Sequence, residues 1–174
     1  GIRNTGTISF NQTWYADLPY VIESSMIINS GVALTVQPGA VVKFNKGAIG
    51  LTVNGALVAN GTDTAPITFT SIHDDMFGGD TNNNNGATRA ARGDWDKILY
   101  NDSSTDAQNL LNYVTVLYAG NGNIGVSVSS ASPTISNSHI IHTKGSGIRL
   151  DINSNPSILN NVIENSSQDG LYIT

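Results

Sequence analysis

Five carboxylates gather in the stretch from His73 to Asp96, and these are the side chains of the sequence best able to support chemistry: Asp74, Asp75, Asp80, Asp94 and Asp96. Within this stretch Asp80, Asn82 and Asn84 occupy alternate positions. Calcium-binding loops use this spacing to turn carboxylate and amide oxygens toward one hard cation. We therefore predict a structural calcium site whose ligands are Asp75, Asp80, Asn82, Asn84 and Asp94.

The match to a calcium loop is incomplete, so a second interpretation stays open. The glycine expected directly after the third ligand is one position late, at Gly86, and no Glu follows at the distance that would supply a bidentate ligand. In the alternative interpretation the Asp and Asn side chains form Asx turns and hydrogen bonds without any metal.

The same carboxylates could also act in catalysis, because glycosidases place two acidic groups on either side of a sugar bond. A lyase would add a base, for which Arg89, Arg92 or Lys97 is available. All of these residues lie in one local stretch, however, and the outward positions of the expected strands carry no acidic cluster. The sequence therefore assigns no catalytic residue and favours a non-enzymatic role. Trp95 is a candidate glycan contact, which keeps a carbohydrate-binding module open as a further alternative.

The elements that must position this stretch are set by a repeat that is clearest between Ser132 and Thr174. Seven residues recur 23 positions later: Pro133, Ile135, Asn137, Ile140, Gly147, Ile148 and Leu150 are matched by Pro156, Ile158, Asn160, Ile163, Gly170, Leu171 and Ile173. A fixed period of this length is typical of a solenoid. The short alternating apolar pairs predict strands, with inward residues stacked on the same residue types one turn away. Asn137 and Asn160 are expected to form a corner ladder of side-chain amides.

Between residues 31 and 71 the alternation of apolar and polar residues predicts further strands of the same solenoid. Pro38-Gly39, Asn54-Gly55 and Asn60-Gly61 supply the turns. The fold class predicted is therefore all-β, a solenoid of parallel strands, with the stretch 73–96 as one long Asp/Asn-rich loop inserted between two turns.

The sequence resembles right-handed parallel β-helix proteins of the pectate-lyase-like family, and in particular a secreted bacterial surface-protein subgroup. The resemblance rests on the repeat above and on LTVQPGAVVKF, LTVNGALVANGT, APITFTS and GGDTNNNNGATRAARGDW. It implies the fold, but it does not imply one activity, because such proteins include polysaccharide lyases, hydrolases, tailspikes, adhesins and surface proteins without assigned chemistry.

Residues 1–30 show the weakest repetition, and we predict that they form an N-terminal cap whose aromatic residues cover the first turn. Residues 31–174 are then the turns of the solenoid. Thr174 falls inside a strand pattern, and we expect the chain to be a fragment of a longer protein. The open C-terminal turn exposes strand edges, so self-association through this turn is expected.

Composition limits the partners and the compartment. Only 12% of the residues are charged, and the net charge is -5. This acidic balance argues against nucleic-acid binding, and no apolar run is long enough to span a membrane. We expect a secreted or cell-surface location and a polysaccharide, a cell-surface glycan or a protein as the partner. Three roles remain open: a non-catalytic scaffold or adhesion/recognition segment, the N-terminal part of a polysaccharide lyase or glycoside hydrolase, and a carbohydrate-binding module.

Overall fold

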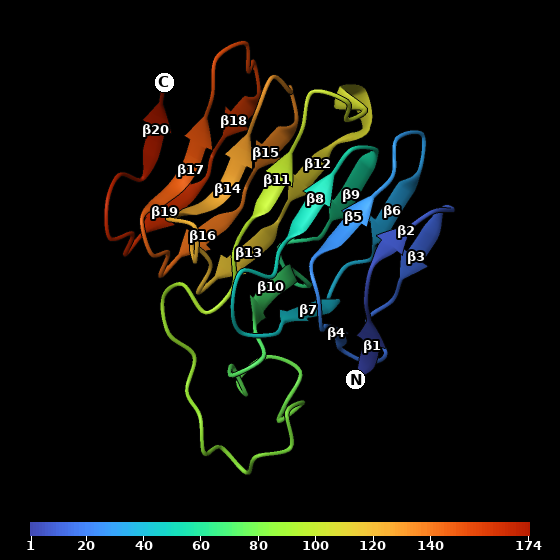
Figure 1. The fold of residues 1–174 in the computed structure, drawn as a ribbon, viewed down its shortest axis with the longest axis vertical. Coiled ribbons are helices and arrows are strands. Elements are labelled where there is room, and N and C mark those ends of the chain that lie inside the picture. Colours follow the sequence, from blue (N-terminus) through green and yellow to red (C-terminus); the bar gives the residue numbers. More distant parts are fainter.

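Each turn of the chain contributes short strands to three parallel sheets, and about seven such turns form a right-handed parallel β-helix (Figure 1). This architecture comes from a computed structural model that describes residues 1–174. The strands of successive turns lie side by side along the whole solenoid, from the N-terminal to the C-terminal end. The fold class predicted from the sequence is therefore confirmed.

Within each of the three sheets the strands lie in chain order. The first sheet contains β1 (Ile2–Asn4), β4 (Tyr20–Ile22), β7 (Val41–Phe44), β10 (Ile67–Ser71), β13 (Val114–Leu117), β16 (His139–Ile141) and β19 (Val162–Glu164). The second contains β2 (Thr7–Ile8), β5 (Met26–Ile28), β8 (Leu51–Val53), β11 (Ile98–Tyr100), β14 (Ile124–Val128), β17 (Ser146–Leu150) and β20 (Leu171–Ile173). The third contains β3 (Gln12–Trp14), β6 (Ala33–Val36), β9 (Ala56–Asn60), β12 (Leu110–Asn112), β15 (Thr134–Ser136) and β18 (Ser157–Leu159).

Inward residues of successive turns stack in register and form the core. In the first sheet Val42 pairs with Phe69, Phe69 with Val116, and Val116 with Ile140, and all four side chains are buried. A slip of one residue would turn every inward side chain to the solvent, so burial of this row fixes the register. The only helical segment is the three-residue 3-10 turn η1 (Asp106–Gln108), and no helix is long and apolar enough to cross a membrane.

The 23-residue repeat sets the pairing of the last turns, as predicted. Asn137 and Asn160 both adopt the left-handed backbone, with φ of 50° and 55°. Asn160 donates its amide to Asn137 Oδ1 over 3.5 Å, and Asn137 donates to Asn112 Oδ1 over 2.8 Å. Asn112 in turn donates to Asn60 Oδ1 over 2.9 Å. The predicted amide ladder is confirmed, and it continues over two more turns than the repeat indicated.

Residues 1–30, which we predicted as an N-terminal cap, form short strands that continue the three sheets. β1 pairs with β4, β2 with β5 and β3 with β6, so the first turns belong to the same three sheets. Trp14 and Tyr20 are buried and stack on each other with 4.5 Å between ring centroids. Both rings therefore belong to the hydrophobic core at the first turns of the solenoid.

The long loop, residues 72–97, joins β10 to β11 and projects from one side of the solenoid (Figure 1). Its first part lies against the outward face of the first sheet. Lys43 of β7 and Thr70 of β10 are paired on that face, and both side chains are fully buried. The loop therefore covers outward positions that would otherwise face solvent.

Candidate functional site

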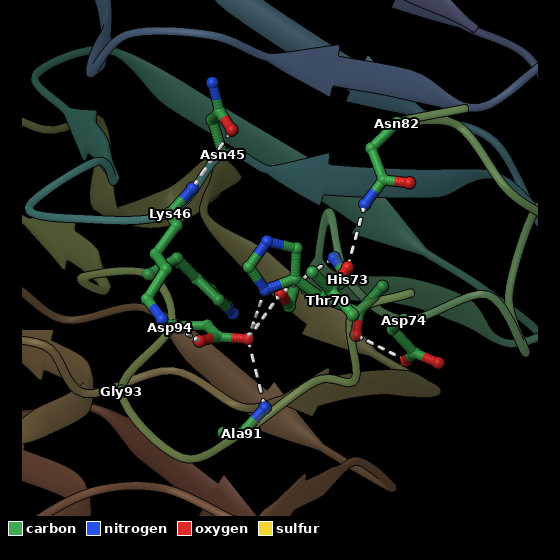
Figure 2. A network of polar contacts seen from close by, with 12 residues as sticks. Asn45, Lys46, Thr70, His73, Asp74, Asn82, Ala91, Gly93 and Asp94 are labelled. Atoms are coloured by element: carbon green, nitrogen blue, oxygen red, sulfur yellow. Dashed lines mark hydrogen bonds and ion pairs between the residues drawn. The ribbon is translucent and has the colours of Figure 1, made fainter. Parts of the chain in front are cut away.

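The C-terminal end of the long loop is fixed by Asp94, a buried carboxylate. Its Oδ2 accepts hydrogen bonds from Ser71 Oγ over 2.8 Å and from the Ala91 amide over 3.0 Å. His73 Nδ1 lies 3.3 Å from the same oxygen, and Lys46 Nζ lies 3.8 Å from Oδ1. Figure 2 shows this carboxylate with the Lys46 and His73 side chains and the loop backbone at Ala91. Asp94 thus joins the end of the loop to the end of β10.

The N-terminal end of the loop is fixed in a similar way by Asp74. Thr70 Oγ1 donates to Asp74 Oδ2 over 2.6 Å, and the Met76 amide donates to Oδ1 over 3.2 Å (Figure 2 shows the first of these contacts). Asp74 is buried, and hydrogen bonds of this kind to a carboxylate are stronger than neutral ones. Each end of the loop is therefore held against β10 by a buried aspartate of the loop itself.

The middle of the loop contacts a buried lysine that the sequence analysis did not identify as a site residue. Lys43 Nζ donates to the carbonyl oxygen of Gly79 over 2.5 Å. Burial lowers the pKa of the Lys43 ammonium, while the negative charges of Asp74, Asp75 and Asp80 act to raise it. The only sequence signal for this role is a lysine at an outward position of an otherwise apolar strand.

The tip of the loop is closed by its own side chains. The backbone N–H of Asn84 donates to Asp80 Oδ1 over 3.2 Å, and the backbone N–H of Asn85 donates to Asp80 Oδ2 over 2.8 Å. The Ala87 amide donates to Asn84 Oδ1 over 3.0 Å. These are the Asx-type bonds of the metal-free interpretation, and they occupy two of the five predicted calcium ligands.

The donor set predicted for calcium does not come together as one site. Asp94 belongs to the network at the end of the loop, and the three predicted carboxylates, Asp75, Asp80 and Asp94, form no group able to hold a metal ion. Among the predicted ligands, only Asp75 and Asn82 have a buried side-chain oxygen without a hydrogen-bond partner, which is Oδ1 in both. The three carboxylates of the predicted set therefore do not form one group in this structure, and calcium binding by the loop stays a prediction.

Trp95 is not the glycan contact that the sequence analysis proposed. Its side chain is 0% exposed and stacks on Phe44, with 4.1 Å between ring centroids and 5° between the ring planes. Its indole Nε1–H donates to the carbonyl oxygen of Leu117 over 2.7 Å. That prediction was wrong, because the chain has already returned to the solenoid core at this residue.

A cleft of about 350 Å³ opens where the long loop meets the end of β13. Its wall includes loop residues and one residue from the next turn: His73, Asp74, Asp75, Met76, Gly86, Thr88, Arg89, Ala90 and Tyr118. Tyr118 has a positive φ of 61° and stacks on His142 at 5.5 Å. Burial raises the pKa of the Tyr118 hydroxyl, and the charges of Asp74 and Asp94 add to this effect. The sequence analysis missed Tyr118, because its place at the cleft depends on how the loop folds back.

Two further hollows lie on the solenoid surface, and neither has loop residues in its wall. One, of about 410 Å³, contains Tyr113 and His139, and the other, of about 570 Å³, contains Arg149 and Tyr172. The Arg149 guanidinium lies 5.9 Å from the centre of the Tyr172 ring and donates to Asp151. The cleft at the long loop differs from both in having walls fixed by buried carboxylates.

Three parallel sheets wound around one core define this protein as a parallel β-solenoid. A family model described as a pectate-lyase like beta helix domain matches residues 6–130, and the chain belongs to that family. The comparisons with curated proteins and with solved structures each gave no match. Membership accounts for the fold, and the activity has to be argued from the site.

Proposed function

We propose that this chain is a non-catalytic recognition segment of a secreted or surface-anchored bacterial protein, whose solenoid presents the long-loop cleft to a glycan. The observation that carries the proposal is that the cleft wall is built on residues held in place from both ends. Asp74 and Asp94 fix the loop to β10 through buried hydrogen bonds. A wall that is already ordered loses little conformational entropy when a ligand binds, which favours recognition.

The chemistry of the cleft suits a ligand rich in hydroxyl groups. Tyr118 offers an aromatic ring, and Arg89 is an exposed guanidinium that makes no hydrogen bond to the rest of the chain. Asp75 Oδ1 is an acceptor without a partner. Ligand sites typically combine an aromatic or apolar surface with a few polar groups of this kind.

The buried carboxylates support a binding role over a catalytic one. Asp74 and Asp94 each accept at least two hydrogen bonds from the loop and β10. A glycosidase needs two carboxyl groups that face the sugar bond. In this account both aspartates hold the loop in place instead.

The test is binding to a glycan array, with wild-type protein beside Tyr118→Ala and Arg89→Ala. Tyr15→Ala is the matched control, because Tyr15 is exposed and belongs to the first turns. We expect specific binding that Tyr118→Ala and Arg89→Ala weaken and Tyr15→Ala leaves unchanged. Binding to no glycan would overturn the proposal and direct the search to protein partners.

A catalytic role is the second candidate, in which the chain is the N-terminal part of a polysaccharide lyase or glycoside hydrolase. One observation favours it: the His73 imidazole lines the cleft and contacts the buried Asp94 carboxylate. Incubation with pectin, alginate and neutral polysaccharides, followed by assays for unsaturated products and reducing ends, separates the two roles. Turnover that His73→Gln abolishes would replace the recognition proposal.

Self-association through the last turn belongs to the same proposal. β18, β19 and β20 expose apolar side chains, including Leu159, Leu171 and Ile173. A second copy stacked on these strands would cover them and extend the sheets. Analytical ultracentrifugation over a range of concentrations tests this, with Leu171→Lys expected to reduce any dimer.

A further inference from the structure

Lys43 occupies a position where lysine is rarely found. It lies on the outward face of β7, paired with Val21 of β4 and Thr70 of β10, and its side chain is 0% exposed. Lysine is almost never fully buried unless its charge is paired. Burial of this ammonium therefore needs a compensating partner, and the long loop supplies it.

The loop is shaped to bring a carbonyl oxygen to that ammonium. Gly78 and Gly79 have φ of 69° and 72°, a conformation that favours glycine. A Cβ atom at Gly78 would lie 3.0 Å from Pro19 Cβ and 3.4 Å from Val41 Cγ1, so the loop backbone is packed directly on the sheet at this point. The next carbonyl, that of Gly79, accepts the Lys43 hydrogen bond at 2.5 Å.

The loop also supplies negative charges that favour the charged form of this lysine. The charges of Asp74, Asp75 and Asp80 all act on the Lys43 ammonium, whose direct contact is the Gly79 carbonyl oxygen. A calcium ion interacts with its loop in a comparable way, through carbonyl oxygens and carboxylates.

We propose that the Lys43 ammonium is the cation around which the long loop folds, so that the loop and its cleft keep their shape without calcium. The Lys43 ammonium acts on Asp75 and Asp80, which are carboxylates that a calcium ion in this loop would use, and like charges repel. Lys43 is thus a positioning residue for the cleft.

The test uses trypsin, because Arg89 and Arg92 are exposed cleavage sites within the loop. Protein prepared in chelator and shown by elemental analysis to be metal-free is digested with and without millimolar calcium, and cuts after these two residues are followed by mass spectrometry. The variants are Lys43→Met, which removes charge and donor, and Lys43→Gln, which keeps a donor without the charge. Lys144→Met is the control, because Lys144 is exposed and methionine retains its apolar stem.

We expect wild type and Lys144→Met to be cleaved slowly and at the same rate with and without calcium. Both Lys43 variants should be cleaved at least about tenfold faster in either condition, the size expected for loss of one hydrogen bond to a charged group. Faster cleavage of metal-free wild type than of calcium-loaded wild type would overturn the proposal. Cleavage of Lys43→Gln or of Lys43→Met as slow as that of wild type would also overturn it. If circular dichroism shows that neither variant folds, the comparison of wild type with and without calcium decides alone. Slow cleavage of the metal-free wild-type loop supports an internal cation, and fast cleavage contradicts one.

Discussion

The ring of Trp95, at the end of the long loop, stacks on the ring of Phe44 in β7 with 4.1 Å between their centroids. The neighbour of Phe44, Lys43, points to the opposite face of the sheet and binds the middle of the same loop through Gly79. One strand therefore holds the loop from both faces, through an aromatic stack inside the solenoid and an ammonium outside it. This arrangement explains how a polar stretch of this length can form a defined wall.

Replacing Trp95 should affect stability. Trp95→Ala removes a fully buried ring, its stack on Phe44 and its hydrogen bond to Leu117, and we expect a loss of about 3–5 kcal/mol in the free energy of unfolding. Urea unfolding measures this loss. Met76→Ala, in the same loop but 89% exposed, is the control and should change stability by less than about 0.5 kcal/mol. A Trp95→Ala protein of wild-type stability would contradict the buried position.

The amide ladder should contribute through both its hydrogen bonds and its backbone conformation. Asn137→Ala breaks the bonds to Asn112 and Asn160 and forces alanine into a positive φ, so we expect a loss of about 2 kcal/mol. Asn137→Gly breaks the same bonds but tolerates the backbone, and it should lose less. Thermal and urea unfolding of the two variants separate the two contributions. Equal losses would show that the backbone conformation contributes nothing.

The two aspartates of the loop that the sequence treated alike should behave differently. Asp94→Ala leaves the donors of Ser71 and Ala91 without their acceptor in a buried site, and we expect a loss of about 3 kcal/mol or more. Asp80→Ala breaks bonds at an exposed tip, and its cost should be about 1 kcal/mol. Unfolding by urea compares the two. Equal costs would contradict the assignment of Asp94 as the anchor of the loop.

Tyr100 should limit stability at high pH. Its hydroxyl is buried without a hydrogen-bond partner, and burial raises its pKa above the usual 10.0. Above pH 10 the folded protein therefore keeps the phenol proton while the unfolded chain releases it. The stability linked to this proton is fully present below pH 10 and is lost as the pH rises further. Tyr100→Phe should be as stable as wild type at pH 7, or more stable by up to about 1 kcal/mol. Its advantage should grow between pH 10 and about pH 11, and an advantage that shrinks over this range would contradict the assignment.

Much of the fold could be predicted from the sequence, because each turn of a solenoid repeats the same pattern of apolar and turn residues. The 23-residue period placed Ile135 against Ile158 and Ile148 against Leu171, and both pairs are found. The sequence of the first turns shows no clear repeat, so their strand pairing could not be predicted in this way. Trp14 and Tyr20 lie on strands paired with the next turn, and their stacked rings are part of the core.

The site was harder to predict, because it depends on contacts between distant segments. The Asp80, Asn82 and Asn84 spacing indicated a cation, but no local pattern could show that Lys43, 36 residues before Gly79, would supply the positive charge. In the same way, Trp95 in a polar stretch has the composition of a sugar-binding platform. Only the return of the chain into β11 shows that its ring belongs to the core.

The most direct test of the recognition role is to locate the binding site by nuclear magnetic resonance, titrating isotopically labelled protein with the glycan that binds best on the array. We predict that the largest amide shifts fall on the cleft wall, at residues 73–76, Gly86, residues 88–90 and Tyr118. Shifts that cluster instead at the hollow of Arg149 and Tyr172, or that spread evenly over the solenoid, would contradict the assignment of the long-loop cleft as the recognition site.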